Sequence, residues 1–582
     1  MLWDNYINRS ITCFFCIVLM AFPLAEKINQ SIIFGNYQFV LIFWCFCGLL
    51  CAGLLIPHFF QNIRTKVVHI TLTDLWIICF FTIGVINAFY SCTSENDPVL
   101  YWTWGTVLMG YIFIRNNNIN SHLILHVIVW AGILQAITVI SQQIGIISSN
   151  QKIFKITGTF YNPGPLGGFL AICTVISSGM VLEYRKKNKI LAAIYIIAFF
   201  FNGYALVLAD SRAAYLGLIT GFLILFWNFL PKKIKYMHTI TGFCLSALFF
   251  MLTIFLSYYR PDSAKARLLI WKVSVNMIED KPITGHGIGS FKQKYMLYQA
   301  DYFAKQPTSE YVQVADNVAY PYNEFIHIFV ELGIIGAILL IILYVFLYLT
   351  PALNLSQRII RGAFASLSVF GLFSYPSEVY TLLFLYFALI GLMHNKVLFS
   401  VSISSRLQIV LLTMPLLLST VALADLKFYH SVSKIMNLFF SGSTKSANIF
   451  FKTYYEKLSQ NKTFNYYWAT YLQDNPSLED LQKLPASCET YCTIGTHYTL
   501  DSLYNKAEEY YKIAHNMIPT RQRPLYLLWR LSIQQNDSLR AISQAKALLE
   551  QPLKTESSLN LKIKGEALLF LSQKSDNYKY HE

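Results

Sequence analysis

The stretch "AYPYNEFIHIFVELGIIGA", from Ala319 to Ala337, has the composition of a membrane helix that carries polar residues in its first half. Glu324, His327 and Glu331 stand among apolar neighbours. An α-helix turns by about 100° per residue, so these three side chains fall on one face. Charged groups cost roughly 2.5–3.5 kcal/mol each at the centre of a bilayer. These side chains therefore need an environment other than lipid.

The whole chain has the composition of a membrane protein. Of its 582 residues, 55% are hydrophobic and 13% are charged, whereas a soluble domain carries about 25% charged residues. We interpret the first apolar run as a retained helix, because no small-residue cleavage site follows it. The predicted fold is all-α and polytopic, with about 13 transmembrane helices, near residues 11–25, 37–56, 73–92, 98–114, 121–146, 164–183, 190–209, 213–230, 239–256, 323–349, 359–374, 379–394 and 407–424.

Lysine and arginine are distributed unevenly between alternate loops, as the positive-inside rule requires. With a cytoplasmic N-terminus, the short external loops contain only four of them: Lys27, Lys152, Lys155 and Arg212. The cytoplasmic loops contain fourteen: Arg64, Lys66, Arg115, Arg185, Lys186, Lys187, Lys189, Lys232, Lys233, Lys235, Arg358, Arg361, Lys396 and Arg406. We expect a bacterial inner-membrane protein with an external C-terminal part. The net charge of +15 reflects this topology and does not indicate nucleic acid.

Composition also predicts the domain boundaries. Residues 1–424 form a membrane domain with a large external loop at 257–322, and residues 425–582 form a periplasmic helical domain. In that second domain Cys488 and Cys492 lie four residues apart. They could form a disulfide in an oxidising compartment, but we favour two buried thiols. No His/Cys cluster points to a metal, and we expect no cofactor.

Polar and glycine-rich stretches collect on the predicted external side, which favours a functional site there. Asn162 opens either a simple turn ahead of a helix or part of that site. Arg212 could extend to lipid headgroups, but its place beside Asp210 and Ser211 in a tight turn favours function. The glycines at 285–289 lack the preceding strand and spacing of a nucleotide loop, so we interpret them as a flexible turn. Residues 267–278 have the pattern of an amphipathic interfacial helix.

These residue types suit a reaction on a phosphate. Arginine presents a permanently charged fork to phosphate oxygens, and a helix N-terminus also favours an anion. A carboxylate and an imidazole can take a proton from a hydroxyl. The external loops contain no Asp-x-Asp pair that would bind phosphate through a metal. The combination indicates a membrane enzyme that acts on a lipid-linked phosphate sugar without metal.

Over about residues 70–400 the chain resembles the bacterial O-antigen ligase/polymerase superfamily. The resemblance lies in "GTFYNPGPLGGFLA", the Arg-x-x-x-Leu at residues 212–216, "RLLIWKVSVNMIEDKPITGHGIGSF" and "YNEFIHIFVELGIIGA". Asn323, Gly333 and Gly336 fit a ligase pattern in the last of these. The resemblance implies a GT-C-like membrane fold. It also implies metal-independent transfer of a glycan from undecaprenyl diphosphate to a hydroxyl of an acceptor, of lipid A-core type, on the periplasmic face.

The resemblance also implies roles for individual residues. Arg212 and Arg267 would bind the diphosphate, and we group Asn162 and Asn323 with them as substrate-binding residues. The histidine that activates the acceptor in the family is replaced here by Tyr322.

Tyrosine has a pKa near 10 and is a poor base at neutral pH. The catalytic candidates are therefore Glu324, His327 and Tyr322, with Glu324 or His327 favoured as the base. We expect both favoured residues to face a water-accessible cavity under the long loop.

The C-terminal part resembles a tetratricopeptide (TPR) repeat. One unit is matched by Tyr491, Ile494, Gly495, Tyr498, Ala507, Tyr511, Ala514 and Pro519. A degenerate second unit follows near Leu525, Leu528, Ala541 and Pro552. One repeat cannot bury its own face, so flanking helices from about residue 440 must complete the domain. Structural and partner-binding roles both remain open.

Several functions fit these features. A ligase is favoured over a polymerase, because the ligase pattern fits and an external repeat domain could bind a bulky acceptor. A protein O-oligosaccharyltransferase is an alternative, since Tyr322 leaves the acceptor class open. A lipid-linked sugar flippase or other transporter is disfavoured, because the mid-span positions are nearly all apolar and no internal repeat is visible. The expected partners are an undecaprenyl-diphosphate-linked glycan, a lipid A-core or protein acceptor, and membrane lipids.

Overall fold

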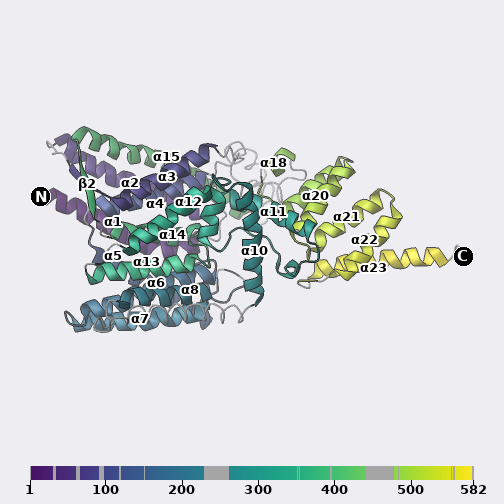
Figure 1. Cartoon of the computed structure of the whole chain (residues 1–582), viewed down its shortest axis with the longest axis horizontal. Coiled ribbons are helices and arrows are strands. Elements are labelled where there is room, and N and C mark those ends of the chain that lie inside the picture. Colours follow the sequence, from purple (N-terminus) through teal and green to yellow (C-terminus); the bar gives the residue numbers. More distant parts are fainter. Residues whose placement is uncertain are drawn as a thin grey trace.

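The computed structural model describes most of the chain as helices, with two short strands (Figure 1). The described ranges are 2–29, 35–60, 66–90, 98–116, 119–227, 261–349, 354–393, 396–440, 478–551 and 553–579, apart from a few single positions within them. The predicted ninth span, 239–256, lies outside the described residues, as do the predicted flanking helices between residues 441 and 477.

A helix overlaps each of the other predicted spans. These helices are α1 (Leu2–Asn29), α2 (Gly35–Phe60), α3 (Leu72–Tyr90), α4 (Pro98–Asn116), α5 (Ser121–Gln143), α6 (Pro163–Tyr184), α7 (Lys189–Ala209), α8 (Arg212–Phe226), α12 (Glu324–Leu349), α13 (Leu355–Gly371), α14 (Tyr380–Leu392) and α15 (Ser405–Phe440). By length and composition, five of the described helices could cross a membrane: α5, α6, α7, α12 and the Ser405–Lys427 part of α15. Shorter apolar helices accompany them. The chain is a helical membrane protein, and the count of thirteen spans stays a prediction.

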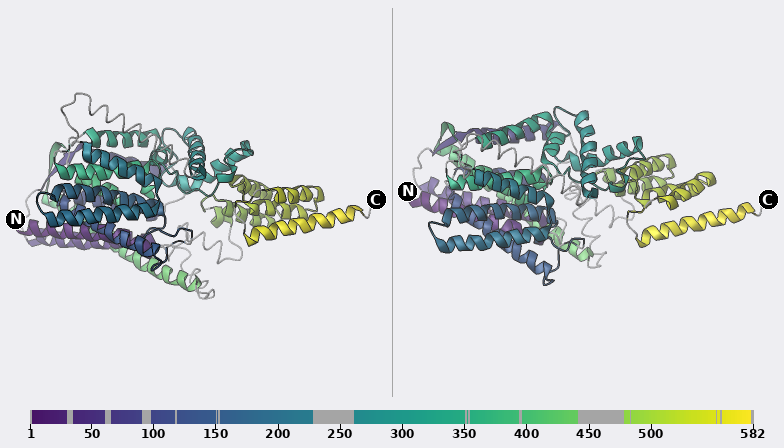
Figure 2. Two further views of the ribbon diagram at one scale, coloured as in Figure 1. Left: turned by 90° about the horizontal axis from the view of Figure 1, so that it is seen from below. Right: turned by 60° about the horizontal axis from the view of Figure 1, so that its bottom comes forward.

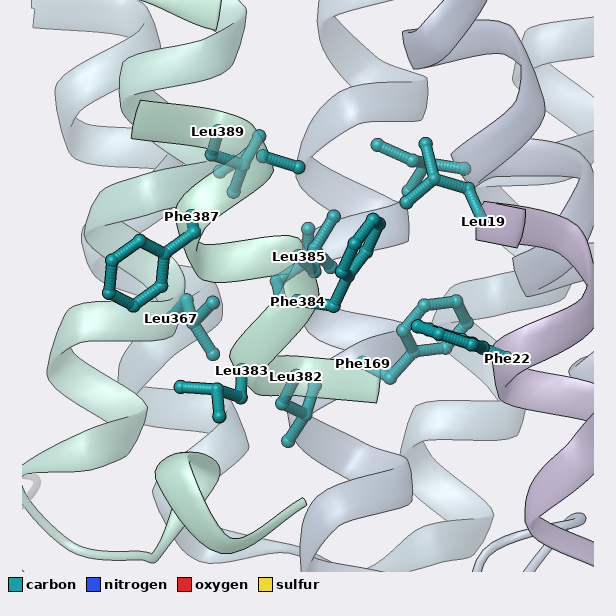
Figure 3. Close-up of a cluster of buried hydrophobic side chains, with 14 of the residues drawn as sticks. Leu19, Phe22, Phe169, Leu367, Leu382, Leu383, Phe384, Leu385, Phe387 and Leu389 are labelled. Atoms are coloured by element: carbon teal, nitrogen blue, oxygen red, sulfur yellow. The ribbon is translucent and has the colours of Figure 1, made fainter. Parts of the chain in front are cut away.

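The apolar core lies around α6. This helix is hydrophobic on all sides, as expected of a central helix. In its most apolar stretch 83% is buried inside the protein, whereas the corresponding value for α15 is 11%. Side chains of α1, α13 and α14 gather around Phe169 of α6 (Figure 3). The rings of Phe22 on α1 and Phe384 on α14 pack edge to face, with centroids 5.1 Å apart. Gly168 on α6 lets the ring of Phe370 approach, since a Cβ there would lie 2.8 Å from it. Close helix packing of this kind is typical of membrane bundles.

Two strands depart from the all-α prediction. Strand β1 (Lys66–Thr71) pairs antiparallel with β2 (Val397–Ile403), and Lys66 lies opposite Ile403. Both segments are rich in β-branched residues, which favour extended structure. The pair joins the loop after α2 to the loop after α14, and β2 lies near the N-terminal end of the bundle in Figure 1.

The long loop forms helices at the opposite end, where α6, α8 and α12 begin; we call this the site end. Its described part contains α10 (Pro261–Asp280), α11 (Ser290–Lys305) and the short η2 (Val312–Val314). The helix predicted at 267–278 is confirmed within α10. Its buried face, with Leu269 and Val273, shares an apolar cluster with Phe291 of α11. This face therefore packs against protein.

The C-terminal helices extend beyond α11 (Figures 1 and 2). They are α18 (Leu478–Gln482), α19 (Cys488–Leu500), α20 (Tyr504–Met517), α21 (Gln522–Gln534), α22 (Ser538–Glu550) and α23 (Ser558–Lys579). The predicted repeat residues form the α19–α20 contact: a Cβ at Gly495 would lie 2.5 Å from the ring of Tyr511. Cys488 and Cys492 are buried free thiols, the favoured alternative. The TPR assignment itself stays a prediction.

Candidate functional site

Helix α12 is broken near the site end. Gly333 has φ 66° and ψ −163°, which separates a short segment from the long apolar helix that follows. Positive φ is tolerated by glycine because it has no Cβ. Glu324, His327 and Glu331 all precede the break, so they lie on the short segment. The three polar side chains therefore belong to a segment that is separate from the long apolar helix.

The glycine turn after α10 binds to this break. The amides of His286 and Gly287 donate to the carbonyls of Val330 and Glu331, at 2.8 and 3.0 Å. A Cβ at Gly285 would lie 2.3 Å from the Glu331 carbonyl oxygen, so only glycine fits there. The predicted turn is confirmed, and its flexibility stays a prediction. The amides of this turn satisfy carbonyls that the broken helix leaves unpaired.

A histidine surrounded by carboxylates forms the first part of the site. His327 Nε2 lies 3.3 Å from Glu331 Oε1 and 3.8 Å from Glu378 Oε1, and its Nδ1 lies 3.7 Å from Glu324 Oε2. We call these four residues the carboxylate–histidine cluster. The predicted common face of Glu324, His327 and Glu331 is therefore confirmed by their contacts.

Glu378 was not identified from the sequence. It belongs to η3 (Pro376–Glu378), the turn between α13 and α14. The Glu378 side chain is 38% exposed, against 13% for Glu324 and 11% for Glu331. It is therefore the carboxylate of the cluster that solvent or an acceptor reaches most easily. The only signal in the sequence was a glutamate in a short turn on the predicted external side.

The other two carboxylates are fixed by backbone amides. Ser377 N donates to Glu324 Oε1 at 2.9 Å, and Phe291 N donates to Glu331 Oε1 at 3.3 Å. The Phe291 ring also packs edge to face on the His327 imidazole. Helix α11 and the η3 turn thus orient the cluster from two sides.

A tyrosine cluster lies next to the carboxylates. Tyr375, three residues before Glu378, stacks on Tyr320 with centroids 4.6 Å apart. Its ring also packs edge to face with Tyr322, at 5.3 Å. Burial raises the pKa of Tyr322, although the charge of Arg267 opposes this shift. Tyr322 therefore stays protonated at neutral pH and can orient a group but not take its proton.

Two arginines form the remaining part of the site. The guanidinium of Arg267 lies 5.5 Å from the centre of the Tyr322 ring, and Arg212 Nη2 donates to Ser263 Oγ at 2.9 Å. Burial, and then the nearby charge of Arg212, lowers the pKa of Arg267 to about 10. Among the described residues no carboxylate forms an ion pair with Arg267. An anion bound between the two arginines would relieve this repulsion.

The two asparagines predicted to bind substrate cap helices. Asn162 Oδ1 accepts from Gly164 N at 2.8 Å at the start of α6. Asn323 Oδ1 accepts from Phe325 N at 2.9 Å and from Ile326 N at 3.2 Å at the start of α12. Both side-chain oxygens thus have the structural role that N-caps commonly have. A role in substrate binding stays a prediction for both.

Within the described ranges, no group of three or more His, Cys, Asp or Glu side chains has the arrangement of a metal site. The metal independence expected from the sequence stays a prediction.

Comparison with known proteins finds a family and relatives that this chain resembles. Residues 196–341 match the family described as O-antigen ligase. The matched range includes both arginines and the part of the cluster on α12. A protein of Rickettsia conorii named "Putative polysaccharide ligase" is 25% identical over 320 residues, which cover 52% of this chain and 72% of the relative. A protein of the same name from Rickettsia felis is 26% identical over 338 residues, covering 55% and 77%.

Proposed function

We propose that this chain, whose residues 196–341 match the O-antigen ligase family and whose relatives are named polysaccharide ligases, transfers a glycan from undecaprenyl diphosphate to an acceptor hydroxyl of lipid A-core type. The observation that carries this proposal is the position of the η3 turn. Tyr375, directly before this turn, contacts the tyrosine that lies under Arg267. Within the turn, Ser377 donates to Glu324, and Glu378 is itself a member of the carboxylate–histidine cluster. One turn thus connects a site for an anion with a site for a proton.

The arginine pair would bind the diphosphate of the donor. When the bond between the sugar C1 and the phosphate oxygen breaks, the negative charge on that oxygen increases. Arginine forks aimed at such an oxygen stabilise the transition state more than the ground state. Arg212 and Arg267 both come from the site end, on α8 and α10.

The cluster would take the proton of the acceptor. The acceptor oxygen forms a bond to the sugar C1, its proton moves to a carboxylate, and the lipid diphosphate leaves. We assign first contact with the hydroxyl to Glu378, because it is the most exposed carboxylate. Glu324 and His327 behind it share the proton through contacts of less than 4 Å. Tyr322 orients the acceptor.

A transfer assay tests this function. Purified protein in lipid vesicles receives an undecaprenyl-diphosphate-linked glycan and a lipid A-core acceptor, with and without EDTA. We expect glycan on the acceptor and free lipid diphosphate in equal amounts, and the same rate with EDTA. Glycan that only crosses the vesicle membrane, without a new covalent product, would instead indicate a transporter.

A protein O-oligosaccharyltransferase is the second candidate. Tyr322 stands where the family resemblance has a histidine that activates the acceptor, and this change leaves room for a different acceptor. A protein acceptor added to the same vesicles distinguishes the two functions, because only one acceptor should become labelled.

The topology belongs to the same proposal. We propose an inner-membrane protein with its N-terminus in the cytoplasm and both the site end and the C-terminal helices in the periplasm. The support is the excess of lysine and arginine in alternate loops. A reporter that is active only outside the cytoplasm, fused after Glu582, should be active. Activity of a cytoplasm-only reporter at that point would contradict this orientation.

A further inference from the structure

The segment that leads into α12 is bound by helices far away in the sequence. Residues 315–322 follow η2 and end at Tyr322, directly before the cap of α12. Lys554 Nζ lies 2.9 Å from Asp316 Oδ2 and 3.3 Å from the carbonyl oxygen of Ala315. Arg521 Nη2 lies 3.3 Å from Asp316 Oδ1. Both basic residues lie in connections between C-terminal helices, Arg521 between α20 and α21 and Lys554 between α22 and α23.

Neighbouring contacts strengthen the same connection. Asn317 Nδ2 donates to Glu489 Oε2 at 2.8 Å, and Glu489 also forms an ion pair with Arg521. Partial burial opposes the shift, but the hydrogen bond and charge of Lys554 lower the pKa of Asp316. Asp316 is therefore ionised at neutral pH and binds two cations at once.

An apolar contact lies beside these polar ones. Buried residues of α11 share one cluster with Cys492 of α19 and with Met517 at the end of α20. Gln299 Nε2 of α11 donates to the Met517 carbonyl oxygen at 2.6 Å, in a buried position. Since Phe291 of α11 also contacts His327, the C-terminal helices support the site end by two routes.

The conformation of Tyr322 explains why such support is needed. Its φ is 54°, in the left-handed region, which is costly for a residue with a bulky side chain. Such a conformation persists only where the surroundings determine it. On one side Trp271 Nε1 donates to the Pro321 carbonyl oxygen at 2.9 Å, and Asn323 caps α12. On the other side the segment is fixed at Asp316.

We infer that Asp316 is a positioning residue. Through Lys554 and Arg521, the C-terminal helices fix residues 315–322 so that the Tyr322 ring lies under Arg267, next to Tyr375. The C-terminal domain thus helps to position residues of the transferase site in its own chain. The effect on turnover rests on the proposed function, whereas the effect on the segment does not.

Two readouts on the full-length protein test this inference. The first is hydrogen exchange of the backbone amides at 315–323, which needs no activity. We expect faster exchange in Asp316→Ala and in Lys554→Ala, and restored protection in Asp316→Glu. The second is transfer kinetics, with kcat lower by about fivefold, equal to about 1 kcal/mol, and KM for the donor unchanged. The double variant should lose less than the sum of the two single losses, because both remove the contact between Asp316 and Lys554.

Lys305→Ala is the matched control, since it breaks the exposed pair with Asp301 on α11. It should leave both readouts at wild-type values. If Lys554→Ala changes neither exchange nor kcat, the inference is overturned. If the wild-type protein transfers no glycan, the proposed function fails, and the exchange result still decides whether the C-terminal helices fix the segment. Lys554→Ala also keeps the test open if Asp316→Ala does not fold.

Discussion

Replacing Glu378 by glutamine removes a carboxylate from the site without changing its shape. The pair with His327 is 3.8 Å long and the Glu378 side chain is 38% exposed, so its loss should cost at most about 1 kcal/mol of stability. A general base contributes about 10²–10⁴-fold to a rate, or about 2.7–5.4 kcal/mol of barrier. We therefore expect a loss of transfer well beyond any loss of folded protein.

The assay is the initial rate of transfer at saturating donor, normalised to protein extracted from the membrane. Glu279→Gln is the control, because it makes the same chemical change at an exposed residue of α10, in the long loop at the site end. We expect Glu279→Gln to keep the wild-type rate and Glu324→Gln to fall with Glu378→Gln. A wild-type rate for Glu378→Gln at normal expression would refute its role as proton acceptor.

Three other outcomes are expected. Arg212→Lys keeps the charge but loses the bidentate fork, so transfer should fall about tenfold or more, and wild-type transfer by both Arg212→Ala and Arg267→Ala would exclude the diphosphate site. Tyr322→Phe should lose less than Glu378→Gln, since Tyr322 only orients the acceptor; complete loss in Tyr322→Phe would reverse this order. The hydrogen bond from Arg540 lowers the pKa of Glu508 to about 2, so the stabilisation from the ionised carboxylate is present above pH ~4.3 and is lost as pH falls through about 2. Exchange of α20 amides, compared with Glu508→Gln at each pH, should show this dependence, and equal exchange at every pH would contradict it.

Local patterns allowed part of the geometry of the candidate site to be predicted. The spacing of Glu324, His327 and Glu331 determines their common helix face, because helix geometry is a local property. The apolar runs likewise predicted the helices. Cys488 and Cys492 were favoured as buried thiols over a disulfide, and the structure agrees.

Other features depend on contacts between distant parts of the chain. Glu378 lies 51 residues after His327 in the sequence. It joins the cluster only because η3 packs against α12. The break at Gly333 forms because the turn at Gly285 supplies hydrogen bonds to it. Asp316 pairs with Lys554 across 238 residues. No local periodicity carries such information.

The most direct test of the account is the fate of the glycan in a strain that lacks this protein. Undecaprenyl-diphosphate lipids and the surface acceptor fraction are analysed by mass spectrometry, with wild-type protein or Arg267→Ala supplied from a plasmid. We expect polymerised glycan to stay on undecaprenyl diphosphate and to be missing from its acceptor, with recovery by wild-type protein and not by Arg267→Ala. Single repeat units correctly joined to the acceptor in the deletion strain would contradict the account and identify a polymerase.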